Sequence, residues 1–343
     1  MKTETDFARY VTRFLSSYLP YERNVSKNTV ASYRDAFVSF IGFIRNEKKI
    51  KLERLTLKDV TKNNILDWLD WLTKNGASMS TRNYRLAAMH SFVTFLQYED
   101  VENLVEWQRI LTIRSVKTEK HVPVYYTVDG IKLLFSQPDT NTYQGLRHLA
   151  ILSLMYDSAC RVQELTDLTV DSLRIQSEPY TIRICGKGRK TRVVPLSENQ
   201  LVVLRKYMDR YGLNDEKCLK YPLFTNSRGD KMTRSGITYI LKKYADMARL
   251  VDASLIPEKA SCHQIRHSKA MHLLQAGVCL IWIRDVLGHT SVQTTEIYAR
   301  ADNKQKRDAL EKAYSHVLPN NKKDGEWHRN QDLLNWLKSL NKN

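Results

Sequence analysis

Two histidines and an arginine stand close together in the segment "CHQIRHSKAMHLL", residues 262–274. Spacings of three and four residues place His263, Arg266 and His267 on one side of a helix. Two histidines at positions i and i+4 can hold a metal ion, whereas an arginine with a histidine suits a phosphate. The types and spacing of these residues therefore predict either a metal site or a phosphate site.

The metal interpretation meets two difficulties. A zinc-protease helix carries H-E-x-x-H, with the glutamate as general base, and position 264 is glutamine. Arg266 would also repel a cation, so we expect no metal. The apolar residues Ala270, Met271 and Leu274 continue the same side of the helix, which therefore faces the interior. A buried arginine needs an anionic partner, which is either a protein carboxylate in a structural salt bridge or a ligand phosphate.

Two further segments carry cationic side chains. Arg161 follows an apolar run in "SACRVQEL", where Glu164 stands three residues on and can orient it. Lys187 lies at the tip of a hairpin in "CGKGRK". This string lacks the G-x-x-x-x-G-K-[ST] pattern of a P-loop, so we expect no nucleotide site here.

The segment "VLGHTSVQTTEIYAR" adds a histidine and a phenol. His289 follows Gly288, which suits the end of a helix. Thr290 or Ser291 is then expected to cap a new helix that carries Tyr298.

Together these side chains suit the metal-free cleavage of a phosphodiester. Tyrosine can act as a nucleophile that forms a covalent intermediate. The planar arginine group binds two phosphate oxygens at once, and removal of one such preorganised donor typically costs about 3 kcal/mol of transition-state stabilisation. A lysine can protonate the leaving oxygen, and histidine transfers protons near neutral pH.

The charge of the chain points to a polyanionic partner. The 343 residues include 54 Lys+Arg and 37 Asp+Glu, a net charge of +17, which favours nucleic acid over a membrane surface. The sequence has no apolar run of about 18 residues and no secretory signal, so we expect a cytoplasmic protein without a membrane span. The five cysteines form no C-x-x-C pair, which argues against a disulfide framework or a cysteine zinc site.

The elements that must position these residues fall into two parts. Up to about residue 110 the pattern is helical, as in "NTVASYRDAFVSFIGFIRNE" with Asn28 or Thr29 as the expected N-cap. The helix in "SMSTRNYRLAAMHSFVTFLQYE" carries Arg82 and Arg85 near its start, and we expect these arginines to contact DNA. The basic segment 113–124 is expected to be a linker.

The second part mixes helices with short strands. An apolar helix is expected over 142–165, and "YTIRI" and "TRVVPL" are expected to pair as a hairpin. Helices follow over 197–211, 233–250 and 263–276, then in "NKQKRDALEKAYSHV" and in an amphipathic segment at 331–341. The predicted fold class is mainly α with a small β-sheet (α+β) in this part, and all-α in the N-terminal part.

These motifs resemble those of the tyrosine recombinase (phage integrase) family, which includes Xer-type recombinases and transposon integrases. Four boxes carry the resemblance: "ACRVQEL", "GKGRKTRVVPL", "HQIRH", and "LGH" with a tyrosine nine residues after the histidine. Ala159-Cys160 departs from the Gly-Leu that the family often has. The resemblance implies a helical core-binding domain over 1–112, the linker 113–124, a catalytic domain over 125–318 and a C-terminal extension over 319–343.

The resemblance also implies a role for each residue. Tyr298 would attack the scissile phosphate and form a 3′-phosphotyrosyl bond, and Arg161 and Arg266 would clamp that phosphate. Lys187 would protonate the departing 5′ oxygen, and His263 would assist proton transfer at the tyrosine.

The remaining implied roles are supporting ones. His289 would hydrogen-bond a phosphate oxygen, His267 would pack, and Glu164 would orient Arg161. Arg189 and Lys190, at the cationic hairpin tip, are expected to contact DNA together with the two arginines of the N-terminal part.

A member of this family would close around double-stranded DNA and act as a tetramer on two sites, without ATP, divalent metal or another cofactor. A core-binding domain that begins near residue 1 is expected to leave no room for the arm-binding domain of many phage integrases, which favours Xer-like or transposon-encoded enzymes. The C-terminal extension then favours an integrase or transposase of a mobile element. A Xer-type resolvase of chromosome or plasmid dimers is the alternative. A type IB topoisomerase and a non-catalytic DNA-binding regulator are further alternatives. The topoisomerase would relax supercoils without strand exchange between sites, and the regulator would not cleave DNA.

Overall fold

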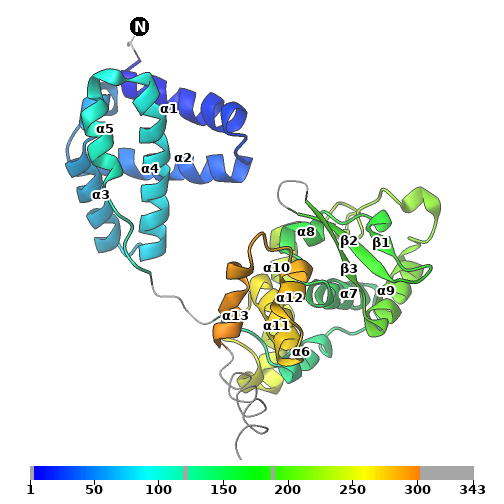
Figure 1. Ribbon diagram of the computed structural model, residues 1–343. Coiled ribbons are helices and arrows are strands. Elements are labelled where there is room, and N and C mark those ends of the chain that lie inside the picture. The colour runs from blue at the N-terminus through cyan, green and yellow to red at the C-terminus, as the bar shows by residue number, and fades with distance from the viewer. Residues whose placement is uncertain (1–3, 119–122, 187–189, 302–343) are drawn as a thin grey trace, which may run out of the picture. The chain divides into compact units, whose positions relative to one another are not determined.

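A computed structural model of the chain describes residues 4–118, 123–186 and 190–301 (Figure 1). The chain divides into two compact units, residues 1–120 and 121–343. The domain limits inferred from the sequence stay predictions. Lys187, Arg189, the helix expected over 303–317 and the amphipathic segment at 331–341 lie outside the described residues.

Every regular element of the N-terminal unit among its described residues is a helix. Its α-helices are α1 (Asp6–Arg13), α2 (Lys27–Asn46), α3 (Lys62–Lys74), α4 (Met79–Glu99) and α5 (Leu104–Leu111). A π-helix, η1 (Phe14–Glu22), follows α1, and short 3₁₀ turns stand at η2 (Leu52–Arg54), η3 (Leu57–Asp59) and η4 (Val101–Asn103).

Aromatic residues form the core of this unit. Phe14 is fully buried, and its ring lies 6.0 Å from that of Phe37 and 5.2 Å from that of Phe92, joining η1 to α2 and α4. The expected N-cap of α2 was wrong: Ser26 caps it by accepting the Thr29 amide at 3.3 Å, so the helix begins at Lys27. Its hydroxyl satisfies a donor that would otherwise lack a partner at the helix start.

The C-terminal unit combines helices with one sheet. Its α-helices are α6 (Val128–Phe135), α7 (Tyr143–Asp157), α8 (Val162–Thr166), α9 (Glu198–Tyr211), α10 (Arg234–Val251), α11 (Cys262–Gln275), α12 (Leu280–Leu287) and α13 (Glu296–Ala301). The strands are β1 (Leu173–Arg174), β2 (Thr181–Cys185) and β3 (Thr191–Pro195), and the 3₁₀ turns are η5 (Val170–Ser172), η7 (Glu216–Cys218), η8 (Ala253–Leu255) and η9 (Val292–Thr294).

The sheet is antiparallel with strand order β1-β2-β3. The predicted hairpin is confirmed: β2 pairs with β3, and the Cys185–Thr191 pair stands next to the hairpin tip. Strand β1 was not predicted, because two residues are too few to show an alternating pattern. The predicted fold class is confirmed, since the described residues are mainly helical with this one small sheet.

Helix α7 forms the centre of the C-terminal unit and packs against α9 and α11 (Figure 1). Its apolar residues are buried all round the helix, which explains the long apolar run in the sequence. The single helix expected over 142–165 is instead two: α7 ends at Asp157, and Ala159 takes a left-handed backbone with φ +47°. This break turns the chain so that α8 begins after Arg161. None of the described helices is both long and apolar enough to span a membrane.

Candidate active site

Arg161 is the N-cap residue of α8, and Glu164 fixes both its backbone and its side chain. The Glu164 carboxylate accepts the Arg161 amide at 2.8 Å and Arg161 Nη1 at 2.8 Å. The Glu164 side chain is 6% exposed and that of Arg161 is 42% exposed. Arg161 therefore presents a solvent-accessible cation that is held by a buried carboxylate.

Arg266, on α11, is the most deeply buried cation of the site. It is 1% exposed, and it donates from Nη1 to the Ala159 carbonyl at 2.7 Å and from Nη2 to the Leu287 carbonyl. Burial above all, then Arg161, lowers its pKa to about 10, so it stays charged at neutral pH. Among the described residues its hydrogen bonds go to carbonyl oxygens rather than to a carboxylate, which favours the phosphate interpretation over a structural salt bridge.

The carbonyl that Arg266 binds belongs to Ala159, whose backbone is strained. An L-residue in the left-handed region costs about 1–2 kcal/mol, a cost that glycine avoids. The glycine that the family often has at this position therefore suits the geometry better than the alanine of this chain.

We expect Ala159→Gly to change the free energy of unfolding by about 1 kcal/mol or less, because relief of strain offsets the loss of one buried methyl group of about 0.8 kcal/mol. Ala159→Val should destabilise by about 1–3 kcal/mol or more, because it overpacks a fully buried site and is β-branched. Urea unfolding of both variants tests this, and a larger loss in the glycine variant would contradict it.

Tyr298, on α13, is buried beside the histidines of α11. It is 1% exposed, and its hydroxyl shares a hydrogen bond of 2.7 Å with His267 Nδ1. Burial raises the pKa of Tyr298 to about 12, although the Arg266 charge lowers it. His263 stacks edge-on against His267, with ring centroids 4.3 Å apart. The sequence predicted a packing role for His267 and did not predict this contact.

His289 follows the C-terminus of α12, which Gly288 ends as predicted, with a left-handed backbone at φ +64°. Its Nδ1 shares a hydrogen bond of 3.0 Å with Thr295 Oγ1, which leaves Nε2 to meet a ligand. Thr290 or Ser291 was expected to cap the helix with Tyr298; Ser291 instead caps the 3₁₀ turn η9, where it accepts the Gln293 amide. Helix α13 with Tyr298 follows this turn.

Acidification from pH 6.5 to 4 is expected to destabilise the C-terminal unit. Burial lowers the pKa of His267 and of His289 to about 4, with nearby His263 and Arg266 adding to the shift. A histidine in the unfolded chain has a pKa of about 6.5. In this window the unfolded state binds more protons, so the free energy of unfolding rises with pH and falls on acidification. Urea unfolding between pH 4 and 7.5 tests this, and His289→Asn should reduce the slope.

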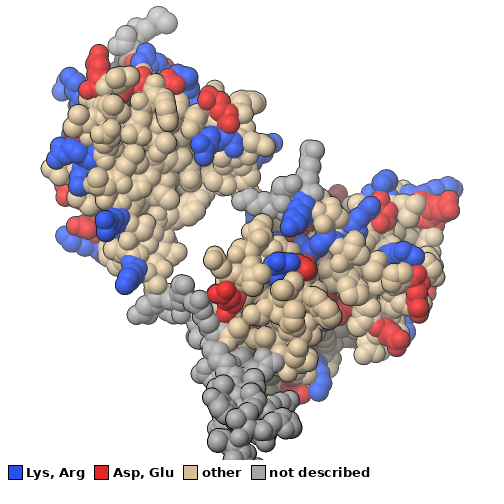
Figure 2. All heavy atoms as spheres, viewed as in Figure 1, with Lys and Arg blue, Asp and Glu red and all other residues tan. Residues whose placement is uncertain are grey.

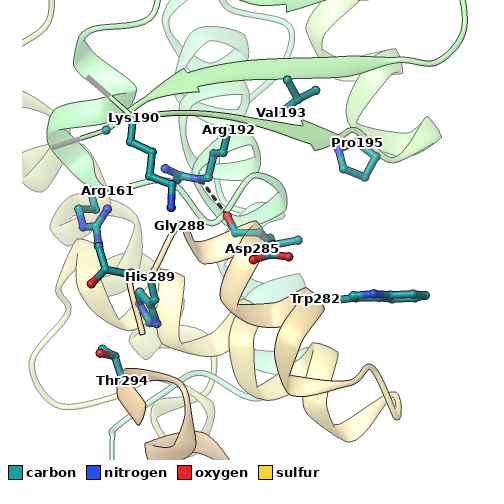
Figure 3. Close-up of a pocket in the computed structure, with 13 residues that line it drawn as sticks. Arg161, Lys190, Arg192, Val193, Pro195, Trp282, Asp285, Gly288, His289 and Thr294 are labelled. Carbon is teal, nitrogen blue, oxygen red and sulfur yellow. Dashed lines mark hydrogen bonds between the residues drawn. The ribbon is translucent and has the colours of Figure 1, made fainter. Parts of the chain in front are cut away.

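A cavity of about 710 Å³ brings several of these residues together (Figure 3). Arg161 and His289 lie on one side of it, Arg192 reaches into it from β3, and Lys190 reaches into it from just before that strand (Figure 3). Lysine and arginine side chains gather on this unit where β2 and β3 approach the hairpin tip (Figure 2). The cavity thus combines exposed cations with a histidine, an arrangement that suits a phosphate.

Arg192 is a residue of this site that the sequence reasoning missed. It lies on β3, and Nη2 donates to Glu164 Oε2 at 2.7 Å while Nε donates to the Val286 carbonyl at 2.9 Å. Strand alternation places Arg192 on the same face as the buried Val194. A basic residue on an inward-facing position was the available signal, because such a residue needs a buried partner.

The predicted DNA contacts of the N-terminal unit stay predictions. Arg82 is 9% exposed, and its buried Nη1 has no hydrogen-bond partner among the described residues. Arg85 Nη1 donates to Ser39 Oγ within the helical bundle. Arg82 is therefore buried inside this unit, whereas Arg85 is half-buried.

Comparison with known sequences identifies the class of this protein. Residues 125–305 match the phage integrase family, and residues 11–100 match the phage integrase N-terminal SAM-like domain. The chain belongs to the phage integrase family of tyrosine recombinases, which are site-specific DNA recombinases.

Two relatives illustrate the similarity. A putative integrase/recombinase, y4rC, of Sinorhizobium fredii is 31% identical over 341 residues, which cover 99% of this chain and 100% of the relative. The tyrosine recombinase XerC of Thermodesulfovibrio yellowstonii is 30% identical over 316 residues, 91% of this chain and 97% of the relative.

Solved structures share the fold. A post-cleavage complex of the XerH site-specific recombinase with its palindromic difH substrate superposes with a TM-score of 0.68 at 20% identity, covering 84% of this chain and 81% of that one. The Tn1549 transposon integrase with transposon right-end DNA gives a TM-score of 0.69 at 15% identity, covering 89% of this chain and 99% of that one.

Proposed function

We propose that this recombinase cuts and rejoins DNA through a 3′-phosphotyrosine intermediate on Tyr298. The phenolic oxygen attacks the scissile phosphorus, the bond from phosphorus to the 5′ oxygen breaks, and the 3′ phosphate becomes an ester of Tyr298. The new ester keeps the energy of the broken bond, so neither ATP nor a divalent metal is required. Attack by the 5′ hydroxyl of another strand releases the tyrosine and completes the exchange.

The surrounding side chains supply charge and proton transfer. Arg161 and Arg266 bind the non-bridging oxygens, and His289 Nε2 donates to the same phosphate. His267 and His263 take up the phenolic proton, and Lys187, assigned by resemblance alone, gives a proton to the departing 5′ oxygen. The observation that carries the proposal is the hydrogen bond between the Tyr298 hydroxyl and His267, on the helix that holds Arg266.

The biological substrate that we favour is the DNA of a mobile element. The putative integrase/recombinase of Sinorhizobium fredii aligns over 99% of this chain, against 91% for the XerC of Thermodesulfovibrio yellowstonii. Dimer resolution is the second candidate, which the several relatives named XerC and XerD support. In either case we propose a cytoplasmic enzyme whose two units close around duplex DNA and whose four protomers join two sites.

Covalent trapping tests the chemistry. The full chain is incubated in EDTA with duplex DNA from both flanks of its own gene, quenched with SDS, and any DNA adduct is located by peptide mass spectrometry. We expect an adduct on Tyr298 that EDTA does not affect. Specific binding without an adduct would instead support a DNA-binding regulator, and relaxation of supercoils without exchange between sites would support a topoisomerase.

The same adducts distinguish the two biological roles. Trapping at the ends of an inserted element supports integration and excision. Trapping at a single chromosomal or plasmid site, with no reaction at element ends, supports dimer resolution.

A further inference from the structure

Glu164 joins two arginines that come from different elements. Arg161 Nη1 donates to Oε1 at 2.8 Å, while Arg192 donates from Nη1 to Oε1 at 3.2 Å and from Nη2 to Oε2 at 2.7 Å. The Arg192 side chain is 10% exposed and that of Glu164 is 6% exposed. Because this pair is shielded from water and salt, it holds β3 and α8 in a fixed relation.

Arg192 also holds the end of α12. Its Nε donates to the Val286 carbonyl at 2.9 Å, one of the last carbonyls of that helix (Figure 3). A cation there also suits the negative end of the helix dipole. Its side chain lies against Gly288, where an added Cβ would stand 2.9 Å from Nη1 and 3.0 Å from Cδ. His289 is the next residue, so the contact reaches the start of the turn that carries this histidine.

We propose that Arg192 is a positioning residue that sets Arg161 and His289 at the correct separation across the cavity. Arg161 is held through Glu164, and His289 is held through the last turn of α12 and Gly288. A phosphate that contacts both groups needs them at one fixed distance, since a displacement of about 1 Å can cost about 100-fold in rate. This inference rests on the proposed function of the site.

The shape of arginine explains why this residue type stands at 192. Its planar group directs Nη1 and Nη2 to the carboxylate and Nε to a carbonyl in another direction. A lysine has a single nitrogen and cannot make both contacts in this geometry. Because each nitrogen of Arg192 already makes one hydrogen bond to a protein atom and its side chain is only 10% exposed, we assign it to positioning rather than to the phosphate itself.

The test is single-turnover cleavage by the full-length Arg192→Lys variant. The substrate is a nicked duplex that carries the site mapped by covalent trapping, at saturating protein. We expect cleavage to slow by about 100-fold while the Kd for the same DNA is unchanged, because only the relation between reacting groups is lost. A wild-type cleavage rate in this variant would overturn the proposal.

The matched control is Arg147→Lys. Arg147 is also a buried arginine of this unit: it is 8% exposed, its Nη1 donates to the Thr225 carbonyl at 2.9 Å, and it is not among the residues that line the cavity. This variant should cleave at the wild-type rate. A loss as large as that of Arg192→Lys would show that general destabilisation, rather than positioning, explains both.

A double-mutant comparison separates positioning from an independent effect. In an Arg161→Lys background, Arg192→Lys should cost far less than in the wild type, because one of the two groups whose separation it sets is already gone. Additive losses would overturn the proposal. If the lysine variant melts below the assay temperature, Arg192→Ala with added guanidinium ion replaces it, and restored cleavage is the expected result; no restoration would count against the inference.

Failure of the positioning inference can be distinguished from failure of the proposed function. If the wild-type protein forms no adduct on any substrate, the proposed function fails. If the wild type cleaves and Arg192→Lys cleaves equally well, the positioning inference fails alone.

Discussion

Replacing Tyr298 by phenylalanine is expected to abolish covalent complex formation and strand cleavage while leaving the fold and DNA binding intact. The variant lacks the oxygen that bonds to phosphorus, and the loss of a covalent nucleophile can reach a factor on the order of 10⁶. The ring itself stays in place, since Tyr298 is 1% exposed and packs among buried apolar residues. The measurement is SDS-stable complex formation on cognate DNA, together with urea unfolding and a DNA-binding isotherm.

The Tyr298→Phe substitution is expected to lower the free energy of unfolding only slightly, so a loss of cleavage can be assigned to the missing hydroxyl. The hydroxyl contributes one hydrogen bond, to His267, and such a bond contributes about 1 kcal/mol net. A matched control is Tyr244→Phe, because the Tyr244 hydroxyl bonds to His148 Nδ1 at 3.0 Å and Tyr244 is also buried. We expect that variant to cleave normally at a similar stability. Cleavage retained by Tyr298→Phe would mean that another residue is the nucleophile.

Local sequence patterns predicted the helices and strands that carry the site residues. They also predicted the burial of one charged residue, Arg266. The apolar side of the helix at 263–276 correctly placed Arg266 in the interior, where it is 1% exposed. The hairpin and the glycine that ends α12 were also predicted, because turn residues and strand alternation act over short distances. Each of these features depends on neighbours within a few positions in the chain.

Contacts between distant segments were not predictable in this way. Arg192 meets Glu164 across 28 positions and Val286 across 94, and His267 meets Tyr298 across 31. A single sequence shows that Arg192 faces inward but not which carboxylate receives it. The break at Ala159 was missed for a different reason: alanine favours helix, and the tertiary fold overrides that preference.

Glu164→Gln is expected to lower the free energy of unfolding of the C-terminal unit by about 3–5 kcal/mol at pH 7, because it leaves two arginines without their buried anion. Burial alone would raise the pKa of Glu164, but the hydrogen bonds from Arg192 and Arg161 outweigh it and hold the pKa below its ordinary value. The carboxylate therefore contributes stability above its unfolded pKa, and this contribution is lost as the pH falls below it.

Asp171→Asn is the matched control for this prediction. Asp171 also meets two basic side chains, Lys220 at 2.8 Å and Arg183 at 3.6 Å, but these partners are 85% and 59% exposed. Solvent screening limits such a pair to about 1 kcal/mol or less. Urea unfolding of both variants, with hydrogen exchange at α8 and β3, makes the comparison. Equal losses would show that Glu164 does not act as a buried anchor, and that Arg161 is held in place by other contacts.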